Sequence, residues 1–193
     1  MIINKEADIL RKIIKAAAAN ISKANQYTKD EEEQIEYAMK IAIFEALKTI
    51  GVIAILSALG YPIQTIIAMA TMILSKPFIG GYHEDSQIKC FLATFIIIGC
   101  IIFLSININL GLGAKIVLNL VALYCIWQQA PIVNSKMPIT KQELINKNRI
   151  LGTSIISVLS IISIATNSID IISNPITWTV VFQALLMFNK RNV

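Results

Sequence analysis

One histidine and one cysteine lie close together in a short polar stretch of an otherwise apolar chain. The stretch runs from Lys76 to Cys90 and contains His83, the only histidine among the 193 residues. A catalytic cysteine needs a base to form its thiolate, and histidine is the side chain that ionises near neutral pH. Cys90 and His83 are therefore candidates for a nucleophile and its general base.

Other chemistries fit this stretch less well. His83 and Cys90, with only Glu84 and Asp85 beside them, fall short of a tetrahedral metal-ligand set with a recognised spacing. A serine hydrolase would need the same histidine, and the chain contains no Gly-x-Ser-x-Gly motif. We therefore expect neither a metal ion nor a cofactor.

The spacing of His83 and Cys90 limits how they can meet. On one straight helix, residues seven apart are separated by ~10.5 Å along the axis, whereas a hydrogen bond needs ~3 Å. Gly80 and Gly81 permit the necessary bend in the backbone. We therefore expect His83 in a loop and Cys90 near the start of the following helix.

That helix start would favour a thiolate. Asp85 or Ser86 is a suitable N-cap, and both the positive end of the helix dipole and Lys89 would stabilise the charge on Cys90. Three side chains could orient the histidine, and the sequence does not choose among them: Glu84, Asp85 and Gln87.

The composition predicts that the bilayer is the solvent for this site. Apolar residues make up 55% of the chain and charged residues 15%, with a mean hydropathy of +0.66, whereas soluble domains carry nearer a quarter charged residues. We predict an all-α integral membrane protein with about six apolar helical segments. They cover residues 35–60, 63–74, 91–110, 115–133, 150–172 and 176–188.

Two of these segments are shorter than the ~20 residues that a span needs. Segment 63–74 follows a break at Gly60–Pro62 and is either tilted, re-entrant or extended at its ends. Segment 176–188 follows a break expected at Asn174–Pro175. The sequence does not decide whether either crosses the bilayer fully.

The N-terminal arm, residues 1–34, has a different pattern. Residues 5–24 alternate apolar and basic positions at helical spacing, which predicts a basic amphipathic helix that lies in the membrane interface or packs on a neighbouring span. Thr28 and Glu31 have capping-box spacing for the next helix. We expect 1–193 to form one membrane-embedded domain, with transmembrane helices from residue 35 onward.

Charge predicts the orientation. With six crossings and a cytoplasmic N-terminus, all of the 17 lysines and arginines except Lys48 and Lys115 fall on the cytoplasmic side, as the positive-inside bias requires. Both termini and the Lys76–Cys90 stretch would then face the cytoplasm. The net charge of +5 is explained by this bias, and no nucleic acid is expected.

Polar and sulfur-containing residues within the spans receive simple interpretations. Glu45 and Lys48 lie three apart on one helical face, where they could pair or reach the headgroups, and no other pair of buried charges is expected. Cys100 and Cys125 lie in apolar runs and are interpreted as packing residues.

The pattern Lys76-x3-Gly80-Gly81-Tyr82-His83-x6-Cys90, in a chain of this size with a basic amphipathic N-terminus, resembles the accessory gene regulator B (AgrB) family over essentially its whole length. That family comprises membrane cysteine endopeptidases of bacterial quorum sensing. The resemblance implies Cys90 as nucleophile and His83 as base, with Gly80, Gly81 and Lys76 in support. Lys76 departs from the arginine frequent in the family.

The resemblance also implies a function and partners. The protein would sit in the bacterial cell membrane, cleave the C-terminal tail from an AgrD-like precursor peptide, and promote thiolactone or lactone closure. Two other functions stay open on the sequence: a non-catalytic peptide exporter, and a structural membrane subunit. Wide apolar faces favour a homodimer, although the sequence leaves the oligomeric state open.

Overall fold

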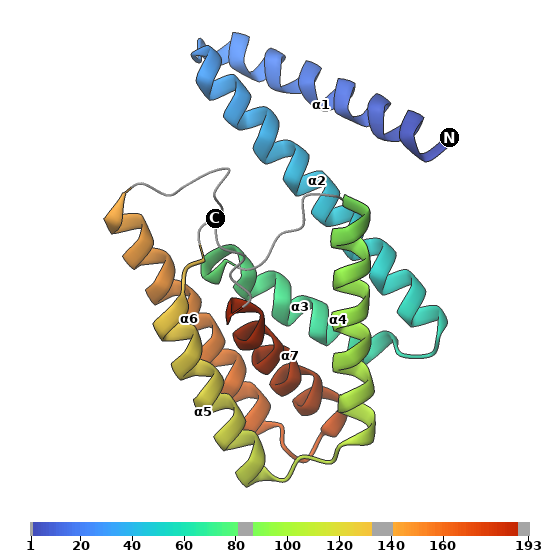
Figure 1. Ribbon diagram of the computed structural model, residues 1–193, viewed down its shortest axis with the longest axis vertical. Helices are drawn as coiled ribbons and strands as arrows, with labels where there is room; N and C mark the ends of the chain where they lie inside the picture. Colours follow the sequence, from blue (N-terminus) through green and yellow to red (C-terminus); the bar gives the residue numbers. More distant parts are fainter. Residues whose placement is uncertain (1, 81–86, 133–140, 189–193) are drawn as a thin grey trace. The chain divides into compact units, whose positions relative to one another are not determined.

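The computed structural model describes residues 2–80, 87–132 and 141–188, and the regular structure in these ranges is helical apart from one isolated bridge. Six of the helices, α2 to α7, are long and apolar enough to cross a membrane. The predicted all-α membrane class is therefore confirmed. In chain order (Figure 1) the helices are α1 (Ile2–Asn25), α2 (Lys29–Ala58), α3 (Pro62–Ile79), α4 (Gln87–Asn107), α5 (Leu112–Gln129), α6 (Gln142–Ala165) and α7 (Asp170–Phe188).

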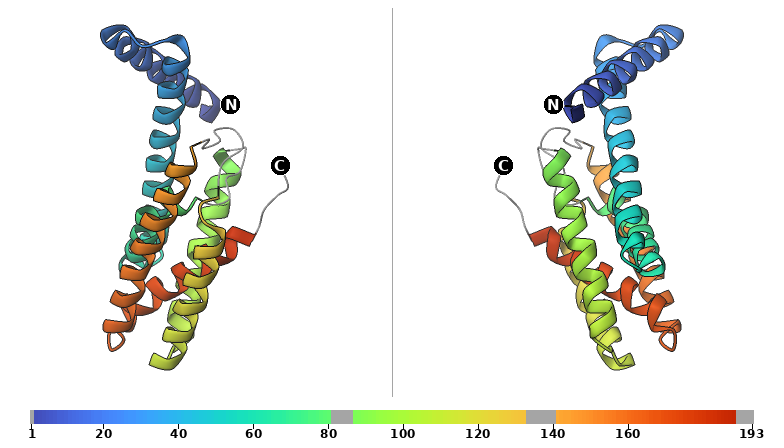
Figure 2. Two further views of the ribbon diagram at one scale, coloured as in Figure 1. Left: turned by 90° about the vertical axis from the view of Figure 1, so that its left-hand side faces the viewer. Right: turned by 90° about the vertical axis from the view of Figure 1, so that its right-hand side faces the viewer.

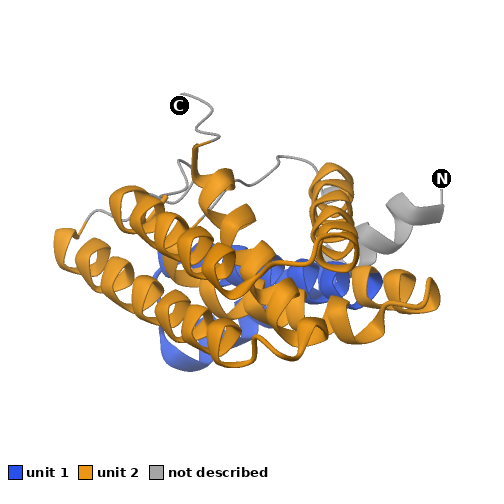
Figure 3. Ribbon diagram, turned by 90° about the horizontal axis from the view of Figure 1, so that it is seen from below, with its two compact units in different colours: residues 1–51 blue, residues 52–193 orange. Residues whose placement is uncertain are grey.

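Contacts divide the chain into two compact units, residues 1–51 and 52–193 (Figure 3). In the first unit, α1 confirms the predicted amphipathic helix. It buries Ile14, Ala18 and Ser22, which recur every fourth residue, and leaves Ile13 and Ile21 exposed. The prediction of one membrane-embedded domain across the whole chain stays a prediction.

The first unit also confirms two polar contacts. The Thr28 backbone N–H donates to Glu31 Oε2 at 2.8 Å, so the predicted capping box begins α2 at Lys29, earlier than residue 35. Further along α2, Lys48 Nζ lies 2.6 Å from Glu45 Oε2. From the sequence alone, these two side chains could either pair with each other or reach the headgroups. In the structure they pair.

In the second unit, α7 is the central helix. Of its apolar window, 56% is buried, against 17–39% for the other five candidate spans. It contacts α3, α4, α5 and α6, and both views of Figure 2 show it crossing obliquely between α4, α5 and α6. A helix surrounded in this way must bury its polar side chains as well as its apolar ones, so these need partners within the protein.

The predicted break at Asn174–Pro175 is wrong, because both residues lie inside α7. The break comes earlier, after α6 ends at Ala165. Proline removes one backbone donor, which would otherwise reach the Ile171 carbonyl, and neighbouring helices make this loss tolerable in membrane helices. Asn174 ties this part of α7 to α4, since its Nδ2 donates to the Ser105 carbonyl at 3.1 Å.

α3 is longer than the predicted segment 63–74. It begins at Pro62, where a missing N–H costs nothing, after Gly60 with φ +96°. It continues through Lys76 and Pro77 to Ile79. Ile79 is 1% exposed and packs in the larger apolar core with residues of α5, α6 and α7. Packing of Ile79 favours continuation of α3 past Pro77. Both α3 and α7 are long enough to be candidate spans.

Candidate functional site

Cys90 lies in the first turn of α4, as expected for a cysteine just after a helix start. Its side chain is half-buried. Its carbonyl accepts a hydrogen bond from Thr94 Oγ1 at 2.9 Å within the same helix. The start of a helix is the end at which backbone N–H groups carry partial positive charge, and Cys90 lies at this end of α4.

A small pocket of about 50 Å³ adjoins Cys90. Three helices line the pocket: the end of α3, the start of α4 and the end of α7. Its lining residues include Met72, Lys76, Gly80, Cys90, Thr94, Gln183 and Leu186. The lining is mostly apolar with a few polar groups, as in most ligand pockets.

The end of α3 is held by the chain that follows α5. The Ile132 N–H donates to the Ile79 carbonyl at 2.9 Å, and Gly80 and Ile132 form an isolated parallel bridge. Gly80 has φ +74°, and a Cβ at this position would lie 2.1 Å from the Ile132 carbonyl oxygen. Only glycine fits this close approach. Gly80 therefore allows the segment that carries Ile132 to lie against the rim of the pocket.

α6 completes this support. Arg149 Nε donates to the Ala130 carbonyl at 2.7 Å, at the end of α5. Gly152 brings α6 close to α3, since a Cβ there would lie 2.6 Å from Ile79 Cγ2. The sequence had placed Arg149 among the basic residues of a cytoplasmic loop. In the structure it also fixes the chain that carries Ile132 against the rim of the pocket.

The structure brings together three of the predicted site residues: Lys76, Gly80 and Cys90 all line the pocket. Gln87 is the first residue of α4. Four predicted residues lie outside the described part of the chain: Gly81, His83, Glu84 and Asp85. Among the residues that are described, no group of three histidine, cysteine or acidic side chains could hold a metal ion.

Gln183 is a pocket residue that the sequence analysis missed. It comes from α7, is 5% exposed, and its Nε2 donates to Ser75 Oγ at 2.6 Å. The two residues are 108 positions apart in the chain, so no local pattern links them. A glutamine within an otherwise apolar helix was the available signal, because polar side chains inside membrane spans are rare and costly.

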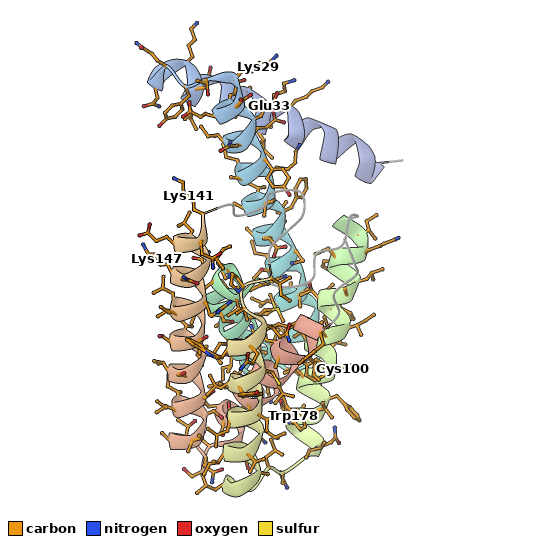
Figure 4. All side chains as sticks on the ribbon, turned by 60° about the vertical axis from the view of Figure 1, so that its left-hand side comes forward. Lys29, Glu33, Cys100, Lys141, Lys147 and Trp178 are labelled. Carbon is orange, nitrogen blue, oxygen red and sulfur yellow. The ribbon has the colours of Figure 1, made fainter. Side chains whose placement is uncertain are left out.

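The two other cysteines differ from each other. Cys125 is half-buried and packs against the larger apolar core, as predicted. The prediction for Cys100 is wrong, since its side chain is exposed midway along α4 (Figure 4). It shares the outer face of that helix with Ile96 and Phe103, which are 61% and 64% exposed. Figure 4 also shows Lys141 and Lys147 extending away from the start of α6.

The sequence analysis also did not expect the pairing of Lys115 with Asp170, in which only the lysine is buried. Lys115 in α5 is fully buried, and its Nζ lies 3.4 Å from Asp170 Oδ1 at the start of α7. The Lys115 ammonium also donates to the Asn167 carbonyl at 3.4 Å. Asp170 is distant in sequence and remains 61% exposed, so spacing along one helix could not reveal this pair.

Comparisons with known proteins cover most of the chain. Residues 14–187 match the family described as Accessory gene regulator B. The chain is 43% identical over 181 residues to "Putative AgrB-like protein 1" of Clostridium perfringens (strain 13 / Type A), covering 94% of this chain and 97% of that protein. No solved structure matches the chain.

Proposed function

The chain belongs to the AgrB family, which supports a role in agr quorum-sensing peptide processing at a membrane, and we propose that it acts there as a cysteine endopeptidase. Its substrate would be an AgrD-like precursor, from which it removes the C-terminal tail. The observation that carries the proposal is the position of Cys90, in the first turn of α4 beside a pocket shared with Lys76 and Gln183.

The first half of the reaction forms an acyl-enzyme. His83 takes the proton of the Cys90 thiol, and the thiolate attacks the carbonyl carbon of the scissile peptide bond. The carbon–nitrogen bond then breaks, and the tail leaves as an amine that carries the proton given back by His83. The core of the precursor stays attached to Cys90 as a thioester.

The second half closes the ring. His83 takes the proton of the precursor's own cysteine, whose sulfur attacks the thioester carbonyl, and Cys90 leaves and regains a proton. A thioester is exchanged for a thiolactone, so the bond type is conserved and little free energy is lost. A precursor serine would give a lactone by the same path. Exclusion of water from the pocket would favour ring closure over hydrolysis.

Orientation belongs to the same proposal. Both termini and the 76–90 stretch would face the cytoplasm, where a ribosomally made precursor arrives. Lys141 and Lys147, exposed around the start of α6, agree with a cytoplasmic end by the positive-inside bias. Labelling single introduced cysteines at residues 141 and 110 in sealed vesicles would test this, with opposite accessibility expected at the two positions.

Co-expression with an epitope-tagged AgrD-type precursor from the same genome tests the chemistry. Wild type should shorten the precursor, whereas Cys90→Ala, Cys90→Ser and His83→Ala should leave it at full length. Cys100→Ala is the matched control, because it removes another thiol from the same helix, and it should process normally. Normal processing by Cys90→Ala would sink the peptidase proposal and favour an exporter or a structural subunit.

A chemical probe gives independent support. A membrane-impermeant maleimide should label Cys90 in inside-out vesicles but not Cys100 or Cys125, which lie within apolar spans. Labelling of all three cysteines at one rate would mean that Cys90 has no special environment.

A further inference from the structure

Gln183 combines two properties that a substrate-binding residue would have. It lines the pocket beside Cys90, and its Oε1 is buried without a hydrogen-bond partner among the described residues. Buried amide oxygens almost always have a partner, and one without a partner is costly. A residue of the pocket wall that has an unused acceptor is a candidate to bind a ligand that brings a donor.

The direction of the neighbouring hydrogen bonds fixes which end of the amide is unused. Ser75 has one hydroxyl proton, which it donates to the Thr71 carbonyl at 2.7 Å. Ser75 Oγ must therefore accept from Gln183, and Nε2 donates to it at 2.6 Å. Reversing the amide would leave both of its N–H groups without a bond to Ser75. Because Nε2 of Gln183 is bonded to Ser75, the amide group that has no partner among the described residues is the carbonyl oxygen, Oε1.

We propose that Gln183 binds the precursor peptide, with its Oε1 accepting a hydrogen bond from a backbone N–H next to the bond that Cys90 cleaves. Ser75 is then a positioning residue that holds the amide in place. A peptide entering an apolar pocket must find partners for its own backbone groups, and Gln183 supplies an acceptor. This inference rests on the proposed function, since it names a contact for the same substrate.

Asn174 provides a matched control on the same helix. It is fully buried, donates one hydrogen bond to another helix, and also has an unpaired carbonyl oxygen, Oδ1. Unlike Gln183, it does not line the pocket of Cys90. Replacing either amide by leucine removes the same kind of group from the interior, so a difference in substrate binding isolates the effect of the pocket.

The experiment uses the full chain in detergent with a fluorescently labelled synthetic AgrD-type precursor. Gln183→Leu should raise KM about 10- to 100-fold and change kcat by less than about threefold, as expected when a contact present in both the ground and transition states is lost. Ser75→Ala should raise KM by a smaller factor. Asn174→Leu should leave KM within about twofold of wild type, whatever it does to the thermal midpoint.

A binding assay separates this inference from the proposed chemistry. In the Cys90→Ala background, adding Gln183→Leu should weaken precursor binding, measured by fluorescence anisotropy, by the same factor as KM. Unchanged binding and KM in Gln183→Leu would overturn the inference while leaving the peptidase intact, and equal losses in Gln183→Leu and Asn174→Leu would mean a structural role. Full activity of Cys90→Ala would instead remove the proposed function.

A folding defect in Gln183→Leu would not leave the question open. Gln183→Met keeps the length of the side chain, and Ser75→Ala leaves the glutamine in place. Normal KM in both of these folded variants would contradict the inference, whereas a raised KM in both would support it.

Discussion

Two polar regions at opposite ends of α7 differ in what surrounds them. Near its start, side chains of α5, α6 and α7 form a polar network that comprises Lys115, Asn119, Ser163, Asp170, Ser173 and Thr177. Near its end, Gln183 bonds Ser75 and lines the pocket of Cys90. Both regions place polar groups inside an apolar protein, where each must find a partner.

The comparison shows that an unpaired atom does not by itself mark a site. Asn119 Oδ1 in the polar network and Gln183 Oε1 at the pocket are both buried without a partner among the described residues. What distinguishes Gln183 is that it lines a pocket that Cys90 also lines. We therefore expect changes in the polar network to alter stability, and changes at the pocket rim to alter processing as well.

The largest effect is expected at the pocket rim, for Gly80→Ala. The new Cβ would meet the Ile132 carbonyl oxygen at 2.1 Å, and φ +74° is unfavourable for alanine. The end of α3 would have to shift and break its pairing with Ile132, which we expect to cost about 3 kcal/mol. The thermal midpoint in detergent should fall, and processing should drop at least about tenfold.

Gly60→Ala is the control for this prediction. Gly60 also has a positive φ, of +96°, but a Cβ there meets nothing within 4 Å. Only the backbone strain remains, which should cost about 1 kcal/mol with processing unchanged per folded molecule. If both glycine variants lose the same stability and process equally well, the close approach at Ile132 has no importance.

The sequence was sufficient for local features of this fold. Each of the six apolar segments corresponds to a helix, Pro62 begins α3, Thr28 and Glu31 form their capping box, and Cys90 lies in the first turn of its helix. These features depend on residues within a few positions of one another, so propensity, capping and hydropathy are enough to predict them.

Features that depend on contacts between helices could not be predicted from the sequence. Cys100 was assigned to the interior, because a uniformly apolar helix gives no sign of which face meets lipid. The break assigned to Asn174–Pro175 ignored the partners that α4 supplies to a central helix. The Ser75–Gln183 and Lys115–Asp170 pairs join residues far apart in the chain. A single sequence does not show which distant residues are in contact.

The second-largest effect is expected within the polar network, for Asp170→Asn. It removes the charge that faces the buried Lys115, and because Asp170 is 61% exposed the cost should be discounted to about 1–2 kcal/mol. Lys115→Met replaces the buried cation with an apolar chain of similar length and should change stability by less than about 1 kcal/mol.

Thermal unfolding of both variants and of the double variant measures the coupling between these two side chains. The double variant should have the same stability as Lys115→Met, because Asp170 has no buried cation to pair with once the lysine is replaced. Processing per folded molecule should stay normal in all three variants. A selective loss of processing would instead connect the polar network to the reaction.

The smallest effect is expected for Ser163→Ala, at the centre of the polar network. Its hydroxyl lies 2.9 Å from the Ser173 carbonyl and 2.5 Å from Thr177 Oγ1, so it joins α6 to α7. Hydrogen bonds between membrane helices contribute about 0.6 kcal/mol on average. Ser157→Ala on the same helix loses only a bond to the Thr153 carbonyl, one turn away, and should change stability by less. A larger loss for Ser157 in unfolding measurements would mean that the polar network contributes less to helix packing than its geometry indicates.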